Sequence, residues 1–252
     1  MLTKIKHDDI LELQLARPPV NALHHPLVQE LKAAVEAAPK QGARAIVISG
    51  VAGMFSAGLD VAFLLQQDQA GMQRFWREFF GMLRSVATSP IPIVAAMTGH
   101  SPAGGAVIAI FCDYRIAAQG KFKIGLNEVQ VGLPVPRVIL AGLARVVGQR
   151  QAERFAVRGI LVSPDEALAA GLVDEVLPPE EVVPKAIGWC RSALKLPQQA
   201  LHTTRNSLRA DYAVMFDTLA SSTEAEMTAV WFSAETQQVL KNLMAQLAAK
   251  KK

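Results

Sequence analysis

Short apolar segments alternate with amphipathic ones along most of the chain, and this alternation constrains the fold more than any other feature. Residues 44–49 and 91–96 are near-continuous apolar runs that end in glycine or polar turns, as expected for buried strands, and residues 11–15 alternate as in a half-buried strand. Amphipathic or apolar stretches at residues 26–36, 72–87, 104–111 and 138–147 predict helices. Strands alternating with helices indicate an α/β fold.

The chain changes character near its C-terminal end. Ser163-Pro164-Asp165-Glu166 carries several helix-start signals and predicts a helix that runs to Gly171, but no strand is predicted beyond about residue 182. We therefore expect residues 1–189 to form a core domain with the functional site, residues 190–252 to form a helical region, and Lys250–Lys252 to be a tail.

The helical region carries more apolar surface than terminal helices can hide against one domain, which predicts an interface between subunits. The apolar residues concerned are Leu201, Leu208, Val214, Met215, Leu219, Met227, Val230, Trp231, Leu240, Leu243, Met244 and Leu247.

Composition excludes several classes of protein. With 252 residues and 51% hydrophobic content, the chain can bury a substantial core without disulfides, and Cys112 and Cys190 stand in no metal-ligand pattern. No apolar run is long enough to span a bilayer, and the net charge of +4 is not gathered into a basic stripe, so neither a membrane nor a nucleic acid is expected as a partner. The first residues lead directly into the strand at 11–15, which is not the apolar core expected of a secretory signal.

The stretch at residues 99–107 places a polar, glycine-bearing turn at the start of an apolar helix. A glutamate, Glu128, follows on a later loop. Backbone N–H groups at the start of a helix have no intrahelical acceptors, so they suit an oxygen that gains negative charge. One base beside one stabilised oxygen is what enolate formation requires. The pattern therefore predicts proton abstraction next to a carbonyl.

Five strings in order carry a resemblance that covers nearly the whole chain. They are Arg17-Pro18-Pro19-Val20-Asn21-Ala22-Leu23, Met54-Phe55-Ser56-Ala57-Gly58-Leu59-Asp60-Val61, Ser101-Pro102-Ala103-Gly104-Gly105, Cys112-Asp113-Tyr114-Arg115-Ile116 and Ile124-Gly125-Leu126-Asn127-Glu128. The chain resembles the crotonase (enoyl-CoA hydratase/isomerase) superfamily, and the last three strings are most similar to its mitochondrial-type Δ3,Δ2-enoyl-CoA isomerases.

The resemblance implies a crotonase-like spiral of strand-strand-helix turns with a C-terminal helical trimerisation region. The expected assembly is a homotrimer or a dimer of trimers, and the expected substrate is an acyl-CoA. Coenzyme A would be part of that substrate, and no metal or redox cofactor is implied. The expected compartment is the bacterial cytoplasm, or the mitochondrial matrix if the protein is eukaryotic.

The resemblance also assigns roles to residues. The backbone N–H groups of Leu59 and Gly104 would stabilise the enolate oxygen, while Asn127 would hold the glutamate or the thioester region. The first binding loop would line the coenzyme A moiety with Ser56, Ala57, Gly58, Leu59 and Asp60. Ala103 and Gly105 would keep side chains out of the path of the thioester.

Glu128 and Val107 decide the predicted reaction. Hydration in the superfamily uses two glutamates, and this chain has Val107 where the first would stand, which leaves Glu128 as a single base. One base suffices to move a proton from C2 to C4 of a 3-enoyl thioester, so a Δ3,Δ2-enoyl-CoA isomerase is expected. A decarboxylase, hydrolase or lyase of the same superfamily would also fit, as would a catalytically silent acyl-CoA-binding relative.

Each motif also has a structural interpretation. Gly58 can simply permit a turn and Asp60 can begin a helix, the glycine pair can serve helix packing, and Glu128 can be a surface carboxylate. Four further sets of residues have both a structural and a functional interpretation. We expect a structural role for His100, no metal at His24-His25, mutual pairing or capping for Asp113 and Arg115, and core packing or contact with the acyl tail for Phe75, Trp76, Phe79 and Phe80.

Overall fold

The main sheet has six strands, and all neighbours in it are parallel except the first pair. The computed structural model describes residues 1–249, without the side chains of residues 219–221. The order along the sheet is β1 (Leu2–His7), β2 (Ile10–Leu15), β3 (Ala45–Ser49), β5 (Ile93–Met97), β7 (Tyr114–Ala118) and β9 (Glu175–Leu177). The predicted buried strands are β3 and β5, in which every residue is buried.

A second sheet of three short parallel strands contains β4 (Gly53–Met54), β6 (Gly99–Pro102) and β8 (Ile124–Gly125). Each follows one of the strands β3, β5 and β7, so both sheets grow by one strand per turn of the chain. A helical segment follows each short strand: α2 (Val61–Leu64) and α3 (Gln69–Ala87), then α4 (Gly104–Ile110), then the 3-10 helix η2 (Glu128–Val131). This is the strand-strand-helix spiral that the family resemblance implies.

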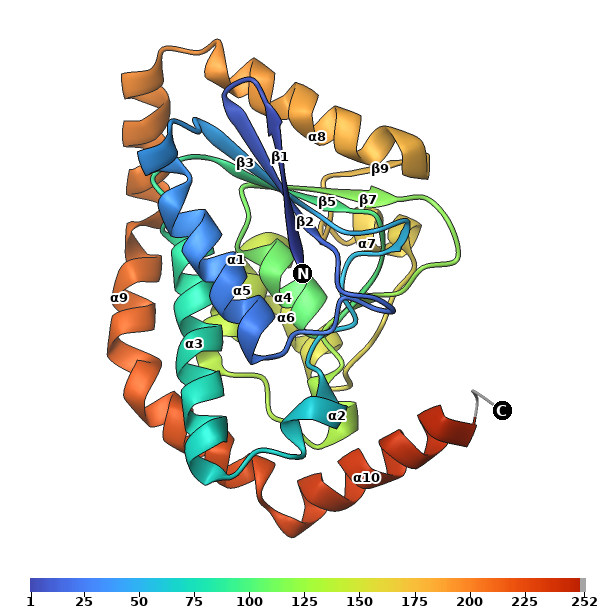
Figure 1. The fold of residues 1–252 in the computed structure, drawn as a ribbon. Coiled ribbons are helices and arrows are strands. Elements are labelled where there is room, and N and C mark those ends of the chain that lie inside the picture. Colours follow the sequence, from blue (N-terminus) through green and yellow to red (C-terminus); the bar gives the residue numbers. More distant parts are fainter. Residues whose placement is uncertain (250–252) are drawn as a thin grey trace.

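Helices cover both faces of the main sheet (Figure 1). On one face α8 (Pro179–Leu194) packs on a small core, and on the other α1 (His25–Ala37), α3 and α4 form the larger one. The predicted helices at 26–36, 72–87, 104–111 and 138–147 correspond to α1, α3, α4 and α5 (Arg137–Val147). The predicted capping box at Ser163 and Glu166 starts α7 (Pro164–Ala169). The short η1 (Pro39–Gln41) and α6 (Gln149–Ala156) have no counterpart in the prediction.

Two long helices form the C-terminal part. Helix α9 (Gln198–Trp231) lies along α3, and α10 (Ala234–Ala249) turns back beside α2 and η2 (Figure 1). The predicted boundary at residues 189 and 190 falls inside α8, where Cys190 is buried against the sheet. The division of the chain into two regions therefore stays a prediction.

Part of the apolar surface expected at an interface is buried within the chain itself. Trp231 and Leu240 are fully buried in the larger core, whereas Leu208 and Val214 are 69% and 65% exposed. The side chain of Leu219 and the predicted tail Lys250–Lys252 lie outside the described residues. The exposed members of the set, such as Leu208 and Val214, are therefore the ones that another subunit could contact.

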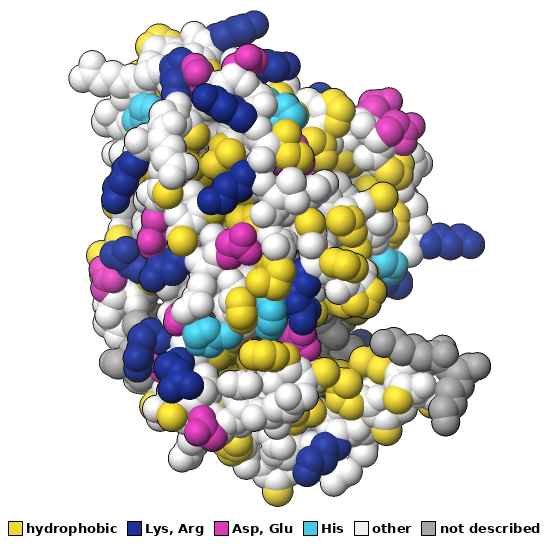
Figure 2. Space-filling view, viewed as in Figure 1, with side chains coloured by type: hydrophobic (Ala, Val, Ile, Leu, Met, Phe, Trp, Pro, Cys, Tyr) yellow, Lys and Arg dark blue, Asp and Glu magenta, His cyan; other side chains and the backbone are white. Residues whose placement is uncertain are grey.

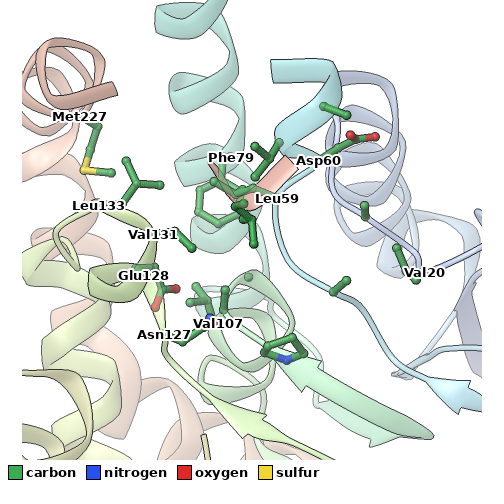
Figure 3. A pocket seen from close by; sticks show the side chains of 18 of the residues that line it. Val20, Leu59, Asp60, Phe79, Val107, Asn127, Glu128, Val131, Leu133 and Met227 are labelled. Atoms are coloured by element: carbon green, nitrogen blue, oxygen red, sulfur yellow. The ribbon is translucent and has the colours of Figure 1, made fainter. Parts of the chain in front are cut away.

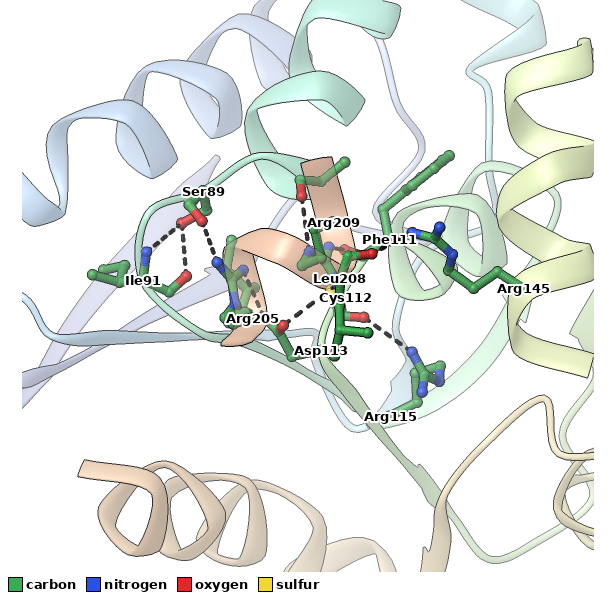
Figure 4. Close-up of polar contacts among 12 residues, drawn as sticks. Ser89, Ile91, Phe111, Cys112, Asp113, Arg115, Arg145, Arg205, Leu208 and Arg209 are labelled. Carbon is green, nitrogen blue, oxygen red and sulfur yellow. Dashed lines mark hydrogen bonds and ion pairs between the residues drawn. The ribbon is translucent and has the colours of Figure 1, made fainter. Parts of the chain in front are cut away.

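Arginines of α9 fasten this helix to the end of α4 (Figure 4). Asp113 accepts hydrogen bonds from Arg205 Nε and Nη2 at 2.7 and 2.9 Å, and Arg209 Nη1 lies 3.4 Å from the same carboxylate. Arg209 also donates to the carbonyls of Ala87 and Phe111. The expected pairing of Asp113 with Arg115 does not occur, because Arg115 binds Asp174 at 2.8 Å, but both roles are structural as predicted.

Cys112 and Cys190 are both free and buried. None of the helices in residues 1–249 combines the length and apolar character that crossing a membrane requires.

Candidate active site

A cavity of about 550 Å³ opens between the N-terminal loop, the spiral and the two C-terminal helices. Its wall is mostly apolar: α3 contributes Trp76, Phe79 and Phe80, α4 contributes Val107, and the segment after η2 contributes Leu133 and further residues (Figure 3). Helices α9 and α10 supply Met227, Leu243, Met244 and Leu247. The surface is hollowed where α10 leaves the body, and apolar side chains lie along α10 there (Figure 2). Such a wall suits a ligand with a long apolar part.

The backbone amides of Leu59 and Gly104 lie at the wall on two adjoining loops. A Cβ on Gly104 would lie 3.2 Å from Gly58 Cα, and a Cβ on Gly58 would lie 3.0 Å from Gly104 N, so the loops meet backbone to backbone. Within the described residues neither backbone N–H donates to a protein acceptor. Gly104 is the first residue of α4, so its N–H has no intrahelical acceptor. The bridge between Leu59 and Leu23 is formed by the carbonyl of Gly58 and the N–H of Asp60, not by the N–H of Leu59. Both N–H groups are therefore available to an oxygen in the cavity.

Glu128 is the first residue of η2 and faces the cavity opposite α4 (Figure 3). Its Oε2 is buried and has no hydrogen-bond partner among the described residues. Burial raises the pKa of Glu128 from 4.5 to about 7, while a hydrogen bond with its own backbone acts in the opposite direction. A carboxyl that titrates near neutral pH is suited to take up and give back a proton.

Asp60 is the other carboxylate on the wall, and it is occupied. It pairs with Arg17 at 2.6 Å and accepts the N–H of Phe63 at 3.0 Å, which caps α2. Asn127, next to Glu128, has a buried Oδ1 with no partner in the described part of the chain. The site thus joins a carboxyl and a side-chain amide that each have one buried oxygen without a described partner, and two backbone N–H groups without a described protein acceptor.

The family model for enoyl-CoA hydratases/isomerases matches residues 6–250. The chain belongs to this family. The mouse mitochondrial enoyl-CoA delta isomerase 1 is 34% identical over 218 residues, which is 85% of this chain and 74% of the mouse protein. A probable enoyl-CoA hydratase of Mycobacterium avium is also 34% identical, over 190 residues, 75% of this chain and 74% of that protein.

The solved structure of the human mitochondrial Δ3,Δ2-enoyl-CoA isomerase superposes with a TM-score of 0.95 at 28% identity and covers 100% of this chain and 99% of the human chain. The crotonase fold and an enoyl-CoA hydratase/isomerase-type enzyme are thereby established. Relatives named as isomerases and as hydratases match at the same identity, so similarity does not distinguish the two reactions.

The structure brings most of the predicted site residues of this family member together. Ala57, Leu59, Asp60, Gly104, Asn127 and Glu128 all line the cavity. Ser56 and Gly58 are not among the lining residues, because the Ser56 hydroxyl is buried, donates to Asn21 O at 2.8 Å and accepts the Gly58 N–H at 3.2 Å. They shape the binding loop from behind its exposed surface.

Gly105 also serves packing and does not clear a path for the thioester. A Cβ at Gly105 would lie 2.5 Å from Ser56 O, so the absent side chain lets α4 approach the binding loop. For Asp60 the structural interpretation holds as well, since its carboxylate caps α2 and binds Arg17.

The contribution of α9 and α10 to the cavity could not be predicted from the sequence. Leu243, Met244 and Leu247 have helical spacing, and that signal alone predicts a buried face without saying what covers it. Their position on the cavity wall adds a role that the prediction did not include, and their contact with another subunit stays a prediction. Trp76, Phe79 and Phe80 pack in the core as expected and also line the cavity, while their contact with an acyl tail stays a prediction.

No histidine lines the cavity in the described part of the chain. His100 Nδ1 accepts the N–H of Lys123 at 3.1 Å, in line with the structural role expected for it. His24 packs edge-on against Phe63, and His25 Nδ1 lies 3.4 Å from Glu78. Over residues 1–249, no group of three His, Cys, Asp or Glu side chains is arranged to hold a metal ion.

Proposed function

We propose that the enzyme is a Δ3,Δ2-enoyl-CoA isomerase that converts 3-enoyl-CoA to trans-2-enoyl-CoA with Glu128 as its only base. The observation that carries this proposal is that Glu128 is the one carboxyl on the described cavity wall without an ion-pair partner. Of the two carboxylates on the described cavity wall, Asp60 is paired with Arg17, and the wall also contains the buried, apolar Val107.

The proposed reaction moves one proton. Glu128 takes a proton from C2, and the C–H electron pair forms a C1–C2 double bond while the thioester oxygen becomes negative. The amides of Leu59 and Gly104 would donate to that oxygen, each contributing on the order of 3 kcal/mol to transition-state stabilisation. The dienolate then takes the same proton at C4, which restores the thioester carbonyl and leaves the double bond between C2 and C3.

Hydration is the second candidate, favoured by the similarity to the mycobacterial hydratase. Addition of water requires polar groups that hold and activate it, and the resemblance places the first glutamate of a hydratase where this chain has Val107. Val107 is 1% exposed, and its isopropyl group can neither orient nor deprotonate water. The proposed one-carboxylate reaction uses no metal or redox cofactor, and coenzyme A enters as part of the substrate.

Assembly and location belong to the same proposal. A homotrimer or dimer of trimers is supported by the family resemblance and by exposed Leu208 and Val214, and light scattering that found a fully active monomer would refute it. A cytoplasmic or matrix location is supported by the bacterial and mitochondrial relatives.

Product analysis tests the proposed reaction. Purified protein is incubated separately with 3-hexenoyl-CoA and with trans-2-hexenoyl-CoA, and the products are separated by chromatography. We expect 2-hexenoyl-CoA from the first substrate and little 3-hydroxyhexanoyl-CoA from the second. Efficient hydration without isomerisation would establish the second candidate. Decarboxylation or thioester hydrolysis would indicate a different enzyme of the superfamily, and binding without turnover would indicate a catalytically silent relative.

A further inference from the structure

One peptide unit connects the backbone of Glu128 to helix α10. The carbonyl of Gly132 accepts a hydrogen bond from Thr236 Oγ1 at 2.7 Å. The N–H of Leu133, which belongs to the same peptide, donates to the carbonyl oxygen of Glu128 at 3.0 Å. The Gly132–Leu133 peptide is therefore held at both ends, by α10 on one side and by the backbone of the glutamate on the other.

The contact on the α10 side is buried and closely packed. Thr236 is 1% exposed, and a Cβ on Gly132 would lie 3.2 Å from Thr236 Cα. Ser233 Oγ donates to Thr236 Oγ1 at 3.0 Å and accepts the Thr236 N–H at 3.2 Å, so the hydroxyl proton of Thr236 is left for Gly132. This orientation makes the threonine hydroxyl a directed donor.

Gly132 gives the peptide freedom that other residues would not. It has a φ of +78°, in the left-handed region, and glycine adopts positive φ about as readily as negative φ. Without an external hydrogen bond, rotation of its peptide would release the Leu133 N–H from Glu128. The start of η2, where Glu128 stands, would then be free to shift.

We propose that Thr236 is a positioning residue for Glu128. Through the Gly132–Leu133 peptide, Thr236 holds the glutamate side chain in its desolvated position at the cavity wall. The importance of Thr236 for catalysis rests on the proposed function, but the effect of Thr236 on the Glu128 carboxyl does not. The same α10 carries Leu243, Met244 and Leu247 on the cavity wall, so the contact also ties that wall to the segment that bears the base.

A displaced Glu128 would titrate differently. Its pKa is high because the carboxyl is desolvated, and no charged side chain contributes to that shift. The other charged groups on the described wall, Arg17 and Asp60, are paired with each other, and the residues of η2 and of the inner face of α10 that line the cavity are apolar apart from Glu128 itself. Access of water to the carboxyl should therefore lower its pKa toward the ordinary value.

The test is a carboxyl titration of the full-length protein without substrate. Protein with ¹³C-labelled glutamate carboxyl groups is titrated by NMR, and the spectrum of Glu128→Gln identifies the signal of Glu128. Thr236→Val removes the hydroxyl at nearly constant shape, and Thr236→Ser retains it. Thr228→Val is the matched control, because Thr228 is also buried and its hydroxyl donates to Glu224 O within α9.

We expect Thr236→Val to lower the titration midpoint of Glu128 by at least about 0.5 pH unit, while Thr236→Ser and Thr228→Val keep the wild-type value. In isomerase assays Thr236→Val should lower kcat about tenfold with KM within about twofold. If Thr236→Val does not fold by circular dichroism, Thr236→Ala takes its place. A midpoint that equals the wild-type value in the variant without the hydroxyl would overturn the inference, and a wild-type protein without isomerase activity would overturn only the proposed function.

Discussion

The Glu128 carboxyl shows how a single environment sets both the protonation and the role of a residue. Its Oε2 is buried without a described partner, which raises its pKa to about 7, whereas Asp60 on the same wall is paired with Arg17 and caps a helix. Two carboxylates on one cavity wall thus have different environments, which suit Glu128 to the proposed proton transfer and Asp60 to a structural role.

Replacing the base should separate binding from chemistry. We expect Glu128→Gln to lower kcat for isomerisation at least about 10³-fold, since the amide keeps the volume of the side chain but cannot take a proton. Acyl-CoA affinity, measured by calorimetry, should change little. Glu153→Gln on the exposed surface of α6 serves as the control and should be fully active. Normal turnover by Glu128→Gln would remove Glu128 from the mechanism.

The reaction should depend on pH through the same group. Only the ionised carboxyl can accept the C2 proton, and the pKa of Glu128 is raised to about 7, so kcat/KM should fall about tenfold per pH unit below pH 7 and level off above it. Initial rates between pH 5.5 and 8.5 measure this fall in kcat/KM. A profile that stays flat down to pH 5.5 would show that the base is not a desolvated carboxyl.

Val107→Glu tests whether the second carboxylate determines the reaction. The new carboxylate would stand on the cavity wall beside the reacting carbons, and we expect weak hydration of 2-hexenoyl-CoA together with slower isomerisation. Some stability should also be lost, because Val107 is buried in α4 and the new charge is desolvated. A folded variant that binds substrate but forms no 3-hydroxyhexanoyl-CoA would show that this position alone does not select the reaction.

Among the elements, α4 shows how packing can depend on the absence of a side chain. Gly105→Ala would place its Cβ 2.5 Å from Ser56 O, a backbone atom that cannot move aside cheaply. We expect a loss of about 2 kcal/mol in the free energy of unfolding and a lower kcat, because α4 also carries the Gly104 donor. Gly188→Ala in α8 has no neighbour within 4 Å and should instead stabilise the protein slightly. Urea unfolding measures both, and equal effects would refute the packing argument.

Elements with caps and long periodic faces could be predicted from the sequence, and short ones could not. Helices α1, α3 and α5 have a clear apolar face, and Ser163 marks the start of α7. Strands β4 and β8 have two residues each, too few to show a period, and exist because neighbouring turns of the spiral pair them. The glycine-bearing turn and Glu128 could be singled out from the pattern, the roles of the other site residues depended on the family resemblance, and the contribution of α10 needed the three-dimensional arrangement.

At the scale of the whole molecule, the attachment of α9 to the spiral depends on buried charge. Arg205 is 8% exposed and binds Asp113 with two hydrogen bonds, so Arg205→Ala would leave a carboxylate largely desolvated and weakly compensated. We expect a loss of about 3 kcal/mol in the free energy of unfolding. Arg84→Ala breaks the exposed pair with Asp217, which also ties α9 to the body, and should have a much smaller effect. Similar losses in the two variants would contradict this account.

The central claim, isomerisation by a single glutamate, is tested most directly by following the proton. 3-Hexenoyl-CoA with deuterium at both C2 positions is converted in ordinary water, and the product of the first turnovers is analysed by mass spectrometry and NMR. Since the buried Glu128 carboxyl would carry the label from C2 to C4, the product should be 2-hexenoyl-CoA with deuterium at C4 in a substantial fraction of molecules. A product with only solvent hydrogen at C4, or 3-hydroxyhexanoyl-CoA in place of the isomer, would contradict the account.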